Sequence, residues 1–188
     1  MSSENKLNLD IFKIVCKALS RSVSLRTMTK HMAQLLVGAM EIKGSTIFAL
    51  NPETKVLEIM ASFGLSPDYL NKGPVMADRG ICAIYEGKPV IVKDVSKDDR
   101  LQYPKEAKEE GIGAIVSLCI PFYGETIGGL RLYHHEPWDI SDHDLDYLSI
   151  MVEHVGLAMI FTRAVSALQS IEETMGDLPV ELDPLLGR

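Results

Sequence analysis

The sequence predicts an α/β fold of the α+β type, in which a central antiparallel sheet carries the N- and C-terminal helices on one face and short helices and loops on the other. Two segments rich in β-branched and aromatic residues, 112–123 and 126–133, flank Gly124-Glu125, a link short enough for a tight hairpin. Both faces of the first segment are mostly apolar: one face carries Ala114, Val116, Leu118 and Ile120, and the other Ile115, Ser117, Cys119 and Pro121. A strand that is apolar on both sides must be covered on both sides.

The N-terminal part of the chain predicts two helices followed by a hairpin. Apolar residues recur at helical spacing over 9–23 and over 25–40, and Ser24 is placed to cap the second helix. Strands are expected over 45–50 and 55–63, joined by a turn rich in Asn, Pro and Thr.

The middle of the chain predicts short pieces rather than long elements. A helical turn is expected at 67–70, another at 81–85, a short buried strand at 89–92, and a helix beginning at Pro104. The segment 64–110 is therefore the expected cover for the second face of the sheet.

A long helix closes the fold. Ser141 with Asp144 three residues later matches a capping box with Asp in place of Glu. One apolar stripe follows Leu148, Met151, Val155, Ala158, Phe161, Val165 and Leu168, and a second follows Ile150, Leu157, Ala164 and Ile171. So wide an apolar surface predicts burial both by the sheet and by something else.

The net charge, the hydropathy pattern and the cysteine content exclude some classes of binding partner. The net charge of −7 leaves no basic footprint for nucleic acid. No apolar run approaches the roughly 20 residues of a membrane span, and no signal sequence is visible, so we expect no membrane partner. The three cysteines, Cys16, Cys82 and Cys119, form no CxxC pair, which fits reduced thiols and a cytoplasmic location.

The element order and two sequence blocks resemble the GAF domain family. The blocks are DRGICAIYEGKPVIVKDV, residues 78–95, and GIGAIVSLCIPFYGETIGGLRLYHHEPWDISDHDLDYLSIM, residues 111–151. The resemblance implies a sensory or regulatory module and covers about residues 20 to 162. We expect an N-terminal dimerisation helix over 1–23, the GAF-like domain over 24–162, a helical extension over 163–174 and a tail over 175–188. The signatures of cyclic-nucleotide and bilin binding are not matched, and the cofactor stays unknown.

Several residues are candidates for lining a small-molecule site between the sheet and its cover. Such sites combine apolar walls with a few aimed polar groups. The candidates are Cys82, Tyr85, Asp94, Tyr103, Ser117, Cys119 and Arg131. Each has a plainer alternative, as a buried thiol, an exposed loop residue or a surface arginine.

No metal site is predicted. His134 and His135, with the acids of 139–144, are the densest set of potential ligands. Adjacent strand residues point to opposite faces, however, and helix capping already accounts for the acids.

The helix stripes predict a homodimer. We expect its interface to use Phe12, Val15, Leu19, Phe161, Val165 and Leu168. The predicted function is non-catalytic: an unidentified small molecule shifts a conformational equilibrium that the helices relay to a separate output protein. Two alternatives stay open, an enzyme resembling free methionine sulfoxide reductases that uses Cys82 or Cys119, and a ligand-free dimerisation module.

Overall fold

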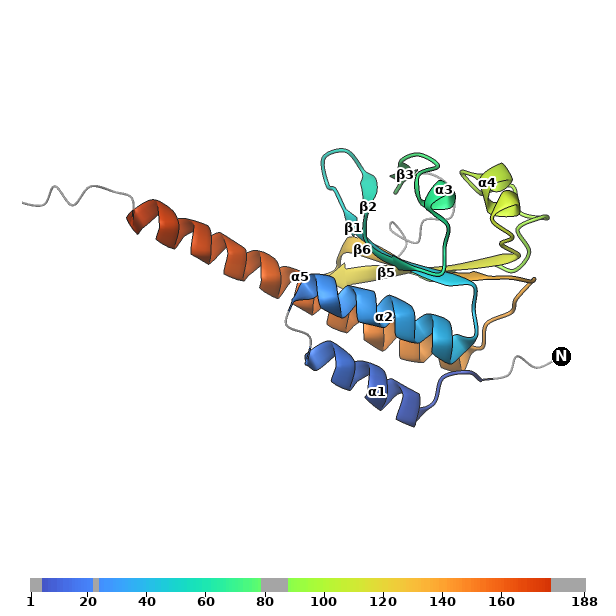
Figure 1. Ribbon diagram of the computed structural model, residues 1–188, viewed down its shortest axis with the longest axis horizontal. Helices are drawn as coiled ribbons and strands as arrows, with labels where there is room; N and C mark the ends of the chain where they lie inside the picture. The colour runs from blue at the N-terminus through green and yellow to red at the C-terminus, as the bar shows by residue number, and fades with distance from the viewer. Residues whose placement is uncertain (1–4, 22–23, 79–87, 177–188) are drawn as a thin grey trace, which may run out of the picture.

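The computed structural model describes residues 5–21, 24–78 and 88–176 (Figure 1). Its helices are α1 (Leu9–Ser20), α2 (Leu25–Met40), α3 (Pro67–Leu70), α4 (Pro104–Glu109) and α5 (Asp142–Gly176). Its strands are β1 (Gly44–Leu50), β2 (Val56–Phe63), β3 (Val75–Met76), β4 (Val90–Val92), β5 (Ala114–Phe122) and β6 (Glu125–His134). The short strand β3 was not expected from the sequence, and the predicted turn at 81–85 lies outside the described residues.

The strands form one sheet in the order β3-β2-β1-β6-β5-β4, with antiparallel pairing throughout, which confirms the predicted fold class. The central hairpin turns one residue earlier than predicted, at Tyr123-Gly124 rather than Gly124-Glu125. Tyr123 and Gly124 both have positive φ, 53° and 79°, as the favoured two-residue hairpin turn requires. Glu125 consequently belongs to β6 and pairs with Phe122.

One face of the sheet is covered by α2 and α5, with α1 packed outside them (Figure 1). The main hydrophobic core lies here and joins residues of β5 and β6 to residues of α2 and α5. The predicted alternation of β5 is confirmed, because Val116, Leu118 and Ile120 belong to this core. Ser24 caps α2 as predicted, accepting a hydrogen bond from the amide of Thr27 at 3.2 Å.

The opposite face lies under α3 and α4, and β3, the edge strand paired with β2, stands on the same side, as Figure 1 shows. We call residues 64–78 and 93–110 the roof. A second core joins them to the sheet, and in it the ring of Tyr69 packs edge-on against Tyr133 at 5.8 Å. Glu110, which follows α4, accepts hydrogen bonds from the amide and hydroxyl of Ser66, which caps α3, and an ion pair from Lys43 at 3.4 Å. The roof is therefore tied together across about 40 residues of chain.

The start of α5 differs from the predicted capping box. Ser141 accepts a hydrogen bond from the amide of Asp144 at 3.1 Å, which is half of the motif. The carboxylate of Asp144 does not complete it. It accepts hydrogen bonds from the backbone amides of Lys6 at 3.0 Å and Leu7 at 2.7 Å. Asp144 thus holds the N-terminal segment in place, and Leu7 is fully buried behind it.

The helix α5 is much longer than the sheet it covers. Its last residue in the main core is Met159, and residues 160–176 project beyond the other elements (Figure 1). By length and mean hydropathy, 1.5 in its most apolar window, α5 over Asp142–Ile171 is the one helix of the described chain that could cross a membrane. Of that window 33% is buried in the domain, where the first half of α5 packs in the main core.

Candidate functional site

A row of polar side chains crosses the middle of the sheet on the roof side. Ser62, Thr46, Arg131 and Ser117 are register neighbours on β2, β1, β6 and β5. The hydroxyls of Thr46 and Ser62 lie 3.0 Å apart. Thr46, Arg131 and Ser117 are all buried, with Arg131 8% exposed. Neighbouring strands lie about 4.8 Å apart, so these groups form one continuous patch within an otherwise apolar face.

Aromatic rings surround the arginine at the centre of this row. The guanidinium carbon of Arg131 lies 5.6 Å from the centre of the Phe48 ring, two residues along β1 from Thr46. On the roof, the ammonium of Lys72 lies 3.7 Å from the centre of the Tyr69 ring and 5.7 Å from that of Tyr103. Cations over aromatic faces are attracted by the ring quadrupole, which partly offsets their loss of water.

Burial and charge in this region shift the pKa values of Lys72 and Tyr69. Burial, followed by the nearby charge of Arg131, lowers the pKa of Lys72 to about 8. Burial also raises the pKa of the Tyr69 phenol. Glu106 and Glu110 act on Lys72 in the opposite direction but do not cancel the effect of burial. The region therefore holds two cations at close range on the sheet and the roof.

Little open space separates the two cations. The cavity bounded by Tyr69, Lys72, Leu101, Gln102, Tyr103, Ile115 and Arg131 has a volume of about 20 Å³. That is enough for one water molecule. Tyr103 and Gln102 fix the roof above it, since both donate hydrogen bonds to the carbonyl of Pro74, at 2.8 and 2.9 Å. A larger occupant requires the roof to move.

Three of the predicted site residues come together here. Ser117 and Arg131 are adjacent on the sheet, and Tyr103 lies above them on the roof side. Cys119 shares their face by register but lines a separate cavity of about 100 Å³ at the edge of the sheet, with Pro89 and residues of α5. The structure therefore separates Cys119 from the polar row.

Asp94, another predicted site residue, makes its contacts within its own turn. Its carboxylate accepts hydrogen bonds from the amide and hydroxyl of Ser96, at 3.0 and 2.6 Å, and pairs with Lys97 at 2.8 Å. Lys97 first, and then Ser96, lower the pKa of Asp94 to about 2. These contacts close a turn that follows β4. Cys82 and Tyr85 lie outside the described residues.

Five further residues of this region were not predicted from the sequence: Thr46, Ser62, Tyr69, Lys72 and Gln102. Thr46 was detectable in principle, because alternation along β1 places it on one face with Phe48. Lys72 and Gln102 lie in irregular segments, where periodicity carries no signal.

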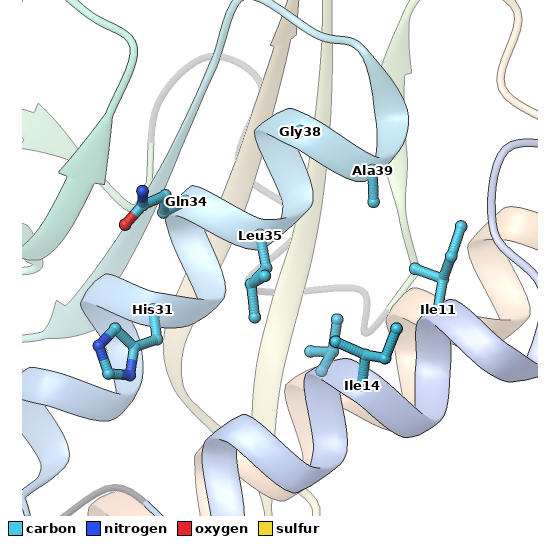
Figure 2. Close-up of a pocket in the computed structure, with 8 residues that line it drawn as sticks. Ile11, Ile14, His31, Gln34, Leu35, Gly38 and Ala39 are labelled. Carbon is cyan, nitrogen blue, oxygen red and sulfur yellow. The ribbon is translucent and has the colours of Figure 1, made fainter.

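A second hollow lies on the helical side of the molecule. Figure 2 shows Ile11 and Ile14 of α1 facing Leu35 and Ala39 of α2 across an apolar groove. The groove has a volume of about 610 Å³, and His31 and Gln34 are its polar members. It lies on the far side of the sheet from the polar row, so the two are separate sites.

The predicted dimer residues divide into two groups. Phe12 packs on Tyr147 of its own subunit with ring centres 5.2 Å apart, and Val15 is 1% exposed in the main core. Both side chains therefore pack against other residues of the same subunit. On α5, Phe161 and Leu168 are largely exposed and Val165 is half-buried. The side chain of Leu19 lies outside the described residues.

The described part of the chain contains no group of three or more histidine, cysteine, aspartate or glutamate residues that could hold a metal. His134 stacks on Trp138 with ring centres 5.2 Å apart and interacts with the backbone of Glu136. His134 therefore closes the end of β6 through local contacts.

Solved structures share this fold at low sequence identity. A GAF domain from a Coxiella burnetii phosphoenolpyruvate-protein phosphotransferase superposes with a TM-score of 0.79 at 18% identity, covering 87% of this chain and 99% of that one. The corresponding Acinetobacter domain gives 0.73 at 19% identity, covering 85% and 96%. Free methionine-R-sulfoxide reductase from Neisseria meningitidis gives 0.70 at 13% identity, covering 87% and 98%.

Among curated proteins no match is found. The family model for the GAF domain matches residues 18–159, which is most of the chain and includes the whole sheet and the roof. Together with the strand order and the helices on one face, this match shows that the chain belongs to the GAF domain family.

Proposed function

We propose that this chain is a non-catalytic sensory or regulatory domain that binds a small molecule between the sheet and the roof. The observation that carries the proposal is the buried polar row of Thr46, Arg131 and Ser117, which faces Lys72 across a narrow space. Polar groups gathered within apolar walls are typical of ligand sites. One structure with the same fold is a domain of a putative two-component sensor histidine kinase protein from Sinorhizobium meliloti, and that likeness is consistent with a sensory role.

The chemistry of the row favours a ligand that accepts hydrogen bonds or carries negative charge. The guanidinium of Arg131 and the ammonium of Lys72 are donors without acceptor capacity, and the hydroxyls of Thr46 and Ser117 can donate as well. An anionic group placed between the two cations would offset their mutual repulsion and regain charge-assisted hydrogen bonds.

The narrow space gives the proposal its mechanism. With about 20 Å³ between roof and sheet, the described conformation has no room for an organic ligand. Binding would therefore favour a conformation in which the roof stands further from the sheet. A ligand with different affinities for two conformations shifts their populations, and that shift is the signal.

The test is ligand-dependent stabilisation of the full chain. Native mass spectrometry of freshly purified protein would report any retained small molecule, and a melting-temperature screen would use small carboxylates, phosphate esters and their neutral analogues. A ligand at 100 times its Kd stabilises by about 2.7 kcal/mol, which raises Tm by roughly 5–11 °C for a chain of this size.

Two variants and one control complete the experiment. Arg131→Met and Ser117→Ala should each reduce the rise in Tm, whereas Arg26→Met, which changes an exposed arginine of α2, should preserve it. The absence of any retained molecule and of any rise in Tm would favour the ligand-free module. A rise that persists in Arg131→Met would show that the ligand binds elsewhere.

The enzymatic alternative makes a separate prediction. Two of the structures with this fold are free methionine-R-sulfoxide reductases, but identities of 13% and 16% carry the fold alone. We favour the non-catalytic function because Cys119 lies apart from the polar row. Turnover of free methionine sulfoxide that is lost in Cys82→Ser or Cys119→Ser would overturn this choice.

A further inference from the structure

The outer face of α5, turned away from the sheet, carries a line of residues that repeats every three and four positions. We call this line the seam: Ile150, His154, Leu157, Phe161, Ala164, Leu168 and Ile171. All seven are exposed, and Leu157, Phe161 and Leu168 expose 60%, 71% and 62% of their surface. The alternation of four and three is the heptad pattern of a helix that packs along another helix.

The sheet-facing side of α5 behaves in the opposite way. Up to Met159 it is apolar and buried in the main core. Beyond Met159 the same side turns polar, with Thr162, Arg163, Ser166, Gln169 and Ser170. The apolar surface of the described projecting turns therefore belongs to the seam and to the positions directly beside it, Ile160, Val165 and Ala167. A helix that packed only on its own sheet would gain no stability from apolar residues on this exposed surface.

The repeat and its flanking residues indicate what covers the seam. Seven positions in one register span about 32 Å of helix. The positions beside the seam, 151, 158, 165 and 172 on one side and 153, 160 and 167 on the other, contain two charged residues, Glu153 and Glu172, one near each end. In a parallel pair each of them lies opposite an alanine, Ala158 or Ala167. Two copies can therefore pair without bringing like charges face to face, even though each chain carries a net charge of −7. Only Arg163 contributes a positive charge between 160 and 171, which is far from the basic face of a helix that binds anionic lipid.

We propose that a second copy of this chain covers the seam, so that two α5 helices pair along Ile150–Ile171 as a two-stranded coiled coil. This assigns the homodimer interface to α5 and leaves the groove between α1 and α2 outside it. The paired helices would be the surface through which the proposed sensory domain signals. The pairing needs no ligand, so it and the proposed function can fail separately.

The test is the subunit count of the full-length chain, measured by analytical ultracentrifugation over a range of concentrations. The wild type should sediment as a dimer at micromolar concentration. The double variant Phe161→Glu/Leu168→Glu should raise the dissociation constant at least 100-fold and sediment as a monomer. Both side chains are exposed in the subunit, so the substitutions should not disturb its fold. The circular dichroism spectrum should stay unchanged. The urea midpoint of the monomer, obtained by extrapolating the measured midpoints to low protein concentration, should stay unchanged too.

Two matched controls locate the interface. Ser166→Glu places the same charge on the same projecting turns, about 200° around the helix from Leu168, and should leave the dimer intact. Ile14→Glu alters the groove between α1 and α2, where Ile14 is 58% exposed, and should also leave it intact.

Other results would contradict the pairing of two α5 helices. A wild type that stays monomeric at 50 µM, or a dimer that survives the double variant, would overturn the proposal. So would a dimer that only Ile14→Glu dissociates. Sedimentation of monomeric wild type with vesicles of phosphatidylcholine and phosphatidylglycerol, lost in the double variant, would show that lipid and not a second copy covers the seam.

Discussion

Removing the carboxylate of Asp144 should release the N-terminal segment from the domain and destabilise the fold. The side chain is 1% exposed and accepts the backbone amides of both Lys6 and Leu7. Leu7 is fully buried in the main core, although it precedes the first helix. Asp144→Ala therefore removes two hydrogen bonds, and without them Leu7 can leave the core.

The size of the loss follows from these contacts. Hydrogen bonds to a charged group contribute about 1.5–3 kcal/mol each, so the two bonds to Asp144 set a ceiling of roughly 3–6 kcal/mol. If the segment detaches, its amides regain water, and the cost becomes the exposure of Leu7, about 1.5–3 kcal/mol. We expect Asp144→Ala to lower the free energy of unfolding by about 3 kcal/mol. Asp144→Asn keeps one carbonyl acceptor and should lose about half as much.

Urea unfolding at a fixed protein concentration measures the loss, and hydrogen exchange at the Leu7 amide reports the detachment directly. Asp142→Ala is the matched control, because Asp142 is an exposed acid in the same helical turn. It should cost no more than about 1 kcal/mol through the helix dipole. Equal losses for Asp144→Ala and Asp142→Ala, or a Leu7 amide that stays protected in Asp144→Ala, would refute the assignment of Asp144 as the anchor.

Two further substitutions test the packing of α5 and the buried cation of the roof. A Cβ at Gly156 would lie 2.3 Å from the carbonyl oxygen of Pro121, so Gly156→Ala should lose about 2 kcal/mol or more in urea unfolding despite the higher helix propensity of alanine; a gain would show that α5 is not held this close to β5. Burial lowers the pKa of Lys72 to about 8, so between about pH 8 and pH 10.5 the unfolded chain binds more protons than the folded one, and stability should rise with pH. Relative to Lys72→Met, the wild type should gain about 2 kcal/mol over that range, a value discounted for partial exposure, and parallel pH profiles would contradict the burial of this amine.

The elements that follow a local period were predictable from the sequence, and the details that depend on turn geometry were not. Helix α2 and strand β5 carry apolar residues at spacings that only one secondary structure satisfies. The hairpin turn was placed one residue late because both Tyr123-Gly124 and Gly124-Glu125 contain glycine. Only the positive φ of Tyr123, an uncommon conformation for an aromatic residue, distinguishes the two registers.

The candidate site was predictable only where one strand determines it. Alternation places Ser117 on one face of β5. Its pairing with Arg131 depends on the turn at Tyr123-Gly124 and on the register shift between Ile120 and Pro121, neither of which was predicted. The pairing of Thr46 with Arg131 joins strands that are 85 residues apart along the chain, and no local pattern encodes that register. Asp94 shows the ambiguity of a polar side chain that follows a strand, since such a residue fits a turn as well as a site. The capping box failed for a related reason, since the partner of Asp144 is almost 140 residues away.

The same two strands connect the polar row to the proposed dimer surface. On β5 and β6, Ser117 and Arg131 face the roof, while the residues beside them, Leu118 and Leu130, face the core that α5 covers. Packed cores change between discrete arrangements rather than deforming gradually. A ligand that moved Arg131 would therefore act on α5 through the thickness of a single sheet. Because the seam begins at Ile150, within the part of α5 that packs on these strands, a change in its tilt would be carried to the projecting half without any intervening loop.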